Sequence, residues 1–254
     1  MAVSNSRFPK LNPPCRGWKL DLAPENIVRN TCSGFLEINV MSDVYMEISR
    51  PFVVMRGVVG LMAIMLTTAS VCIFYDIAKR WQAPDLESVF YLSLSLVLSI
   101  WCPAMAARFT ISIPRDNPIR LNFRRQKIYA YNTSPNWLVP WKTCLVDVAV
   151  YNWAQVRAEY FITNRRIFSG EGIMLSIVQP GTNEVIDRFP LRFGVQDASL
   201  WNYICTYMQH GPCALPPFTT PRDANEVAPY NLFHRLAEKV KWPPEIDRES
   251  TTAP

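Results

Sequence analysis

Two apolar runs, "GVVGLMAIMLTTASVCIFY" at residues 57–75 and "VFYLSLSLVLSIWCPAMAA" at residues 89–107, decide the fold of this chain. Each run holds 19 residues without a charge. As a helix, each spans about 28 Å, close to the hydrocarbon thickness of a bilayer. Two buried core helices are the alternative, but uncharged runs of this length favour membrane helices. Neither run has the position and cleavage pattern of a signal peptide.

The thirteen residues between the runs, 76–88, allow only a tight connection, so residues 51–107 are predicted to form a helical hairpin. The loop offers Lys79 and Arg80. The outer flanks offer more basic residues: Arg50, Arg56, Arg108, Arg115, Arg120, Arg124, Arg125 and Lys127. The positive-inside rule therefore predicts that both termini lie in the cytoplasm. Neither run contains Asp, Glu, Lys or His, which gives an ion-coupled transporter little support.

Beyond the second run, "NPIRLNFRRQKIYAY" at residues 117–131 alternates like two strands joined by a charged turn. A two-residue turn at Arg125 and Gln126 would pair Arg120 with Tyr131 and Asn122 with Tyr129. The turn lacks Gly and Asn, so a longer loop that shifts this register by one remains open.

One face of this hairpin is predicted to be basic and aromatic, and the other apolar. The candidate contact residues are Arg120, Arg124, Arg125, Lys127, Tyr129 and Tyr131. Close to a membrane, they are expected to meet anionic lipid headgroups or an acidic partner surface. The alternative is a solvated hairpin whose charges keep a sheet edge soluble.

Strand patterns continue through residues 108–211, which are predicted to form one cytoplasmic domain. The stretches are "WLVPW", "CLVDVAVYNW", "EYFITNRRIF" and "IMLSIVQPGTNEVIDRFPLRF", with a turn at residues 179–183. An amphipathic helix over residues 197–210 follows and ends at Gly211. Several short strands closed by one helix predict an α+β fold, a pleckstrin-homology-like β barrel or sandwich capped by that helix. A different small β sandwich with a terminal helix is the alternative.

The two ends of the chain are harder to interpret. Residues 1–50 are proline-rich and then alternate around Ser42 and Asp43, which indicates two short strands that either join the later sheet or stand apart. Residues 212–254 contain a proline-rich linker and a basic amphipathic helix over residues 231–242. That helix lies on the membrane surface or docks on the β domain. The last residues are expected to be disordered.

Composition and motifs argue against several functional classes. Seven cysteines without paired spacing suit a reducing compartment, and only two histidines make a zinc site improbable. No nucleophile, phosphate-binding or metal motif occurs, so the expectation is a protein without catalytic residues, cofactor or metal. From Arg108 onward, 17 basic and 13 acidic residues give a net charge of only +4, too weak a field for nucleic-acid binding.

The set "VYMEISR", "PIRLNFRRQKIYAY", "VPW" and "WNYICTYMQHGP" resembles a family of uncharacterised bacterial inner-membrane proteins with two helices and a cytoplasmic β-rich domain. Genes of that family often lie among type VI secretion effector and immunity genes. The resemblance implies a two-pass inner-membrane protein without catalytic residues. Its partners would be membrane lipids and a protein, either an effector or a secretion component. Two functions stay open, an immunity or accessory protein for a secreted antibacterial effector and a membrane-tethered adaptor that organises a cytoplasmic assembly.

Overall fold

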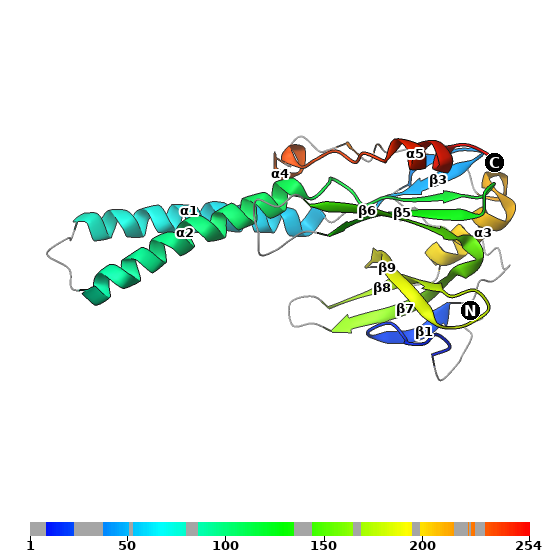
Figure 1. The fold of residues 1–254 in the computed structure, drawn as a ribbon, viewed down its shortest axis with the longest axis horizontal. Helices are drawn as coiled ribbons and strands as arrows, with labels where there is room; N and C mark the ends of the chain where they lie inside the picture. Colours follow the sequence, from blue (N-terminus) through cyan, green and yellow to red (C-terminus); the bar gives the residue numbers. More distant parts are fainter. Residues whose placement is uncertain are drawn as a thin grey trace.

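The structure is a computed structural model that describes residues 9–22, 38–50, 53–79, 86–134, 144–164, 169–194, 199–215, 223, 225–226 and 232–254. In these residues, two long helices project from a β domain built of two antiparallel sheets and further helices (Figure 1). The fold is therefore α+β, as the sequence predicts. The predicted strand "WLVPW" falls outside the described residues.

The projecting helices are α1 (Val53–Lys79) and α2 (Leu86–Ser112), and they lie side by side as the predicted hairpin. Both are long and apolar enough to cross a membrane, with candidate spans Gly60–Ile77 and Val89–Arg108. Their hydroxyl groups donate to carbonyls one turn back in the same helix, as Thr67 does to Ala63 and Ser93 to Val89. These bonds satisfy the hydroxyls without water, as an apolar environment requires.

The first sheet has five strands in the order β2-β3-β4-β5-β6. They are β2 (Ile38–Met41), β3 (Tyr45–Ile48), β4 (Ile119–Asn122), β5 (Lys127–Ser134) and β6 (Leu145–Asn152). The two strands predicted around Ser42 and Asp43 are present and extend this sheet. Because β3 pairs with β4, the helical hairpin is an insertion between two neighbouring antiparallel strands.

The β4–β5 hairpin corrects the predicted register. Arg120 pairs with Tyr129 and Asn122 with Lys127, two residues away from the predicted partners. A four-residue turn at residues 123–126 replaces the two-residue turn, and Gln126 closes it with a φ of 52°. A shift of two keeps every side chain on its predicted face, since the strand period is two.

The second sheet has four strands in the order β1-β7-β8-β9. They are β1 (Trp18–Leu22), β7 (Val156–Asn164), β8 (Ser169–Val178) and β9 (Val185–Phe193). A short 3-10 turn, η1 (Trp153–Gln155), leads from β6 into β7. The predicted turn at residues 179–183 joins β8 to β9, with Gly181 at φ 77°.

The apolar inner faces of both sheets share one core with helix α3 (Ser199–His210), which lies at the end of the sheets away from α1 and α2 (Figure 1). Trp201, Ile204 and Tyr207 of this helix are almost fully buried. Gly211 ends the helix as predicted, at φ 77°, and its amide donates to the carbonyl of Tyr207. A Cβ there would meet the Phe123 ring at 3.1 Å, so the helix end also packs on the β4–β5 turn.

The C-terminal part differs most from expectation. After the 3-10 turn η2 (Pro212–Ala214), helix α4 covers only Leu232–Leu236 of the predicted 231–242, and it contacts α1 and α2. The chain then runs without helix to Pro243. The tail expected to be disordered forms helix α5 (Pro244–Thr251), with Pro244 at the first helical position. Helix α5 lies across the outer face of the five-stranded sheet (Figure 1).

Candidate interaction site

The predicted basic and aromatic face exists, but the chain itself covers it. We call the outward side chains of β4, β5 and their turn the basic face: Arg120, Asn122, Arg125, Lys127, Tyr129 and Tyr131. We call residues 242–254, which lie across them, the C-terminal segment. Alternation places the strand residues of this face together, because the opposite side chains of β4 and β5 lie in the core, and the turn adds Arg125.

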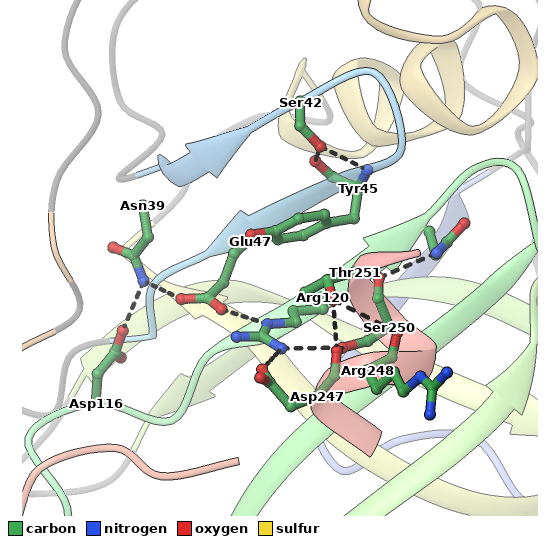
Figure 2. Close-up of polar contacts among 11 residues, drawn as sticks. Asn39, Ser42, Tyr45, Glu47, Asp116, Arg120, Asp247, Arg248, Ser250 and Thr251 are labelled. Atoms are coloured by element: carbon green, nitrogen blue, oxygen red, sulfur yellow. Dashed lines mark hydrogen bonds and ion pairs between the residues drawn. The ribbon is translucent and has the colours of Figure 1, made fainter. Parts of the chain in front are cut away.

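Arg120 is the centre of the basic face and is only 8% exposed. Its Nε donates to Glu47 Oε2 at 2.6 Å, and its Nη1 donates to Asp247 Oδ1 at 2.5 Å and to Ser250 Oγ at 2.9 Å (Figure 2). The guanidinium also lies over the Trp242 ring, 4.3 Å from its centroid. One arginine thus holds β3 and the C-terminal segment together through charge-assisted bonds and a cation–π contact.

A polar chain continues from Arg120 toward the base of the helical hairpin. The second oxygen of Glu47 accepts a bond from Asn39 Nδ2 at 3.0 Å, and the same amide reaches Asp116 Oδ2 at 3.4 Å (Figure 2). Asp116 Oδ1 accepts the backbone amide of Arg50 at 2.8 Å. The covered face is therefore connected by hydrogen bonds to the residues just before α1.

A second ion pair holds the far end of the C-terminal segment. Lys127 Nζ lies 2.6 Å from Glu249 Oε1, and the Tyr129 hydroxyl donates to the same oxygen at 3.1 Å. The bond from Lys127 lowers the pKa of Glu249, while burial and then the nearby Glu249 charge raise the pKa of Tyr129. Both side chains of the ion pair are about one-third exposed, so water weakens this pair.

Backbone carbonyls of the C-terminal segment supply the other contacts. Asn122 Nδ2 donates to the carbonyls of Ser250 and Thr252, both at 3.0 Å. Arg125 donates to the carbonyls of Thr252 and Ala253. These bonds recognise a peptide backbone rather than particular side chains.

Five of the six candidate residues meet the C-terminal segment: Arg120, Arg125, Lys127, Tyr129 and Tyr131, whose ring packs edge-on against Trp242 at 5.3 Å. Arg124 differs, because it is exposed and its guanidinium lies over the neighbouring Phe123 ring. The structure thus brings five of the candidates together around one ligand, which is a part of the same chain.

Sequence reasoning missed the partners Glu47, Trp242, Asp247, Glu249 and Ser250. For the partners in α5, the charge pattern of the sequence could have given a signal. Helix α5 carries Glu245, Asp247 and Glu249 within a segment that follows a basic stretch, which makes it complementary to the basic face. The local pattern does not indicate which basic surface α5 meets, because the ion pairs Arg120–Asp247 and Lys127–Glu249 join residues more than 120 positions apart.

A second buried polar cluster fixes the N-terminal part on the four-stranded sheet. Glu159 is fully buried on β7, accepts the Cys15 amide at 2.9 Å and is paired with Arg188 at 3.1 Å. Ser176 also donates to Glu159. Burial raises the pKa of the Cys15 thiol to about 12, so the thiol stays protonated and is a poor nucleophile. This cluster explains packing, and we assign no chemistry to it.

Among the residues that the structure describes, no group of three or more His, Cys, Asp or Glu side chains lies close enough together to hold a metal ion. The site is therefore characterised by its ion pairs, its hydrogen-bond donors and its aromatic rings.

Comparison with known proteins gives a family but no function. Neither the curated proteins nor the solved structures provide a match. One family model matches residues 96–254, from the middle of α2 through α5, which is 159 of the 254 residues. The matched region contains β4, β5 and the C-terminal segment, and the chain belongs to this family, described as a family of unknown function (DUF6708).

Proposed function

We propose that this protein is a membrane-anchored, non-enzymatic interaction protein. The observation that carries the proposal is the exposure of apolar side chains along α1 and α2. Met65 is 71% exposed, Ile73 56% and Ile100 65%, and the two candidate spans are only 11% and 0% buried. Helices of a soluble core would bury these side chains, whereas a bilayer solvates them.

The proposed location is the bacterial inner membrane, with two passes and both termini in the cytoplasm. The insertion between β3 and β4 supports a hairpin, because both helix ends return to one domain. Fewer flanking arginines are available at the membrane surface than the sequence alone indicates, since Arg115 donates to the carbonyls of Asn225, Arg235 and Ala237. Arg50 and Arg120 are likewise engaged inside the domain. Arg56, Arg108 and Arg124 continue to favour a cytoplasmic domain.

We further propose that the β domain is pleckstrin-homology-like. Two antiparallel sheets share one core, and the amphipathic helix α3 follows the last strand and contributes to that core. This arrangement agrees with a β sandwich whose open end is closed by a helix. Such a domain serves as a rigid support on which a surface face is presented.

The specific role that we propose is that of an immunity or accessory protein for a secreted antibacterial effector of the type VI kind. Its support is the sequence resemblance given above. The alternative is a membrane-tethered adaptor, which the covered basic face favours, because an adaptor needs a surface that binds peptide segments. Deletion of the gene separates them: sensitivity to sibling cells that deliver an effector supports immunity, and a defect without any competitor supports the adaptor.

The anchoring proposal is tested by membrane fractionation of cells that express the full chain. We expect the protein to remain in the membrane pellet after extraction at alkaline pH and to be released only by detergent. A matched variant carries Leu94→Arg and Val97→Arg in α2, where arginine at mid-membrane depth is costly, and less of it should resist extraction. Release of the unchanged protein by alkaline buffer would contradict membrane insertion.

A further inference from the structure

We propose that the basic face is a receptor for an acidic peptide segment of a partner protein, and that the chain's own C-terminal segment is its exchangeable occupant. This inference rests on the proposed function as an interaction protein and names the chemistry of the partner. The ligand class is a short acidic segment led by an aromatic residue.

Charge and shape define what the basic face accepts. Arg120 and Lys127 each bind one carboxylate of α5, those of Asp247 and Glu249, which lie two positions apart. Trp242 lies over Arg120 and against the Tyr131 ring, five positions before the first of these acids. Asn122 and Arg125 bind carbonyls that any peptide carries. A partner segment with an aromatic residue and two such acids would make the same contacts.

The structure is suited to exchange, because departure of the C-terminal segment leaves no buried charge alone. Arg120 keeps its bond to Glu47 and its contact with the Tyr45 ring. Glu47 in turn keeps Asn39. A buried arginine that lost its only carboxylate would oppose release strongly, whereas this one retains a partner on β3.

Although Ser250 is buried, much of what holds the C-terminal segment lies at the surface. Helix α5 has eight residues, too few to be stable in isolation. Ile246 is its one aliphatic side chain, and the Asp247 side chain is 51% exposed. By contrast, α3 is anchored by eight buried side chains. Partly exposed ion pairs contribute little each and weaken with salt, so a competing acidic segment can displace them.

Peptide binding to the full chain in neutral phosphatidylcholine nanodiscs tests the proposal. The probe is a synthetic, fluorescein-labelled peptide of residues 241–254, and the readout is fluorescence anisotropy. Three proteins are compared: the unchanged chain, an Asp247→Asn, Glu249→Gln variant with a weakened resident segment, and that variant with Lys127→Glu added. Near-UV circular dichroism checks that all three are folded.

We expect the weakened variant to bind the peptide at least tenfold more tightly than the unchanged chain. Adding Lys127→Glu, or using a peptide with both acids neutralised, should weaken binding at least tenfold. Equal affinity of the first two proteins, or no binding by the weakened variant, would overturn the proposal. Loss of peptide binding when phosphatidylglycerol replaces part of the neutral lipid would overturn it in favour of a lipid ligand. Failure of these assays leaves membrane retention, which tests the anchoring, unaffected.

Hydrogen exchange on the unchanged chain gives a second test that needs no variant. If the segment is exchangeable, the amides of residues 247–251 should exchange at least 100-fold faster than those of α3, because local release opens them. Added unlabelled peptide should increase that exchange. If the amides of α5 were protected from exchange as strongly as those of α3, α5 would be a permanent part of the fold, and the proposal would be overturned.

Discussion

Arg50 joins the base of the helical hairpin to both sheets. Its guanidinium donates to the carbonyls of Asn117, Tyr131 and Pro190, and to Asn132 Oδ1. Burial lowers the pKa of Arg50 to about 10, although the nearby Asp116 opposes that shift, so the group stays charged at neutral pH. A flexible ammonium could not reach these four acceptors, which lie on β5, on β9 and in the loop before β4, at the same time.

Replacing Arg50 should therefore destabilise the β domain. Arg50→Ala is expected to cost about 3 kcal/mol, because several acceptors lose their donor, and to lower Tm by about 6 °C or more. Arg50→Lys should fall between Arg50→Ala and the unchanged chain. Thermal unfolding in detergent, followed by near-UV circular dichroism, measures both. The control Arg124→Ala, at an exposed position, should change stability by less than about 0.5 kcal/mol. A Tm for Arg50→Ala equal to that of this control would contradict a stabilising role of Arg50 in the β domain.

Acid should release the C-terminal segment through Glu249. The pKa of Glu249 in the folded chain lies below its ordinary value because Lys127 stabilises the carboxylate. Its contribution to docking is therefore present above the pKa of the unfolded chain and is lost as pH falls through the lower, folded pKa. Hydrogen exchange of residues 247–251, corrected for the intrinsic pH dependence, should accelerate on acidification below about pH 4.5. Glu249→Gln should reduce this acid response, and an identical response in both proteins would argue against the ion pair.

At the scale of single elements, the β4–β5 turn shows why the register was mispredicted. Gln126 adopts a left-handed φ of 52° that usually calls for Gly or Asn. Its side chain compensates by donating to the carbonyls of Phe123 and Met208, which also links the turn to α3. The backbone carbonyl of Gln126 accepts the Trp153 amide as well.

Substitutions at Gln126 should separate backbone strain from these bonds. Both Gln126→Gly and Gln126→Ala lose the two side-chain bonds, but only glycine relieves the left-handed strain of about 1 kcal/mol. We therefore expect the glycine variant to be more stable than the alanine variant by about that amount. Chemical denaturation of the two variants side by side gives the difference. Greater stability of the alanine variant would show that the φ value is not what limits residue choice here.

How far the sequence predicted the structure depends on how local each feature is. The apolar centres of α1 and α2, the end of α3 at Gly211 and the two faces of β4 and β5 follow from the local sequence, although each long helix has 27 residues where the uncharged run has 19. The turn at residues 123–126 was missed because a side-chain bond to Met208 replaces the usual turn residue. The α5 contact was missed because ion pairs such as Lys127–Glu249 join distant segments. Strand β1, in the proline-rich N-terminal part, was not predicted at all, because it depends on pairing with the distant strand β7.

At the scale of the whole molecule, the topology can be tested by chemical labelling. In a background without reactive cysteines, Leu86→Cys should react with an impermeant thiol reagent in intact cells, because Leu86 is 87% exposed at the connecting end of the hairpin. Ala253→Cys, in the exposed C-terminal residues, should react only after the cells are opened. The opposite pattern would reverse the proposed orientation, and equal labelling of both would exclude a hairpin spanning the membrane.

The insertion of the hairpin between β3 and β4 predicts a soluble form of the β domain. Replacing residues 53–112 with a glycine-serine linker should leave both sheets intact, because the Arg50 amide and Asp116 already lie in hydrogen-bonding contact. A fragment that starts at Arg108 should fail to fold, since it lacks β2 and β3, including the fully buried Met46. Gel filtration and near-UV circular dichroism compare the two. A folded Arg108 fragment would contradict the five-stranded sheet.

The insertion of the hairpin between β3 and β4 also determines the order in which the strands can pair during synthesis. Strand β3 leaves the ribosome before the hairpin, and its partner β4 leaves after it, with 71 positions separating Ile48 from Ile119. At ordinary translation rates that interval lasts roughly 4 to 14 s. During this time the nascent strands β2 and β3 have no sheet to join, while the apolar helices can already enter a bilayer. Because β3 has to wait for β4, the five-stranded sheet forms only after the hairpin has been synthesised, which leaves time for the proposed membrane insertion to come first.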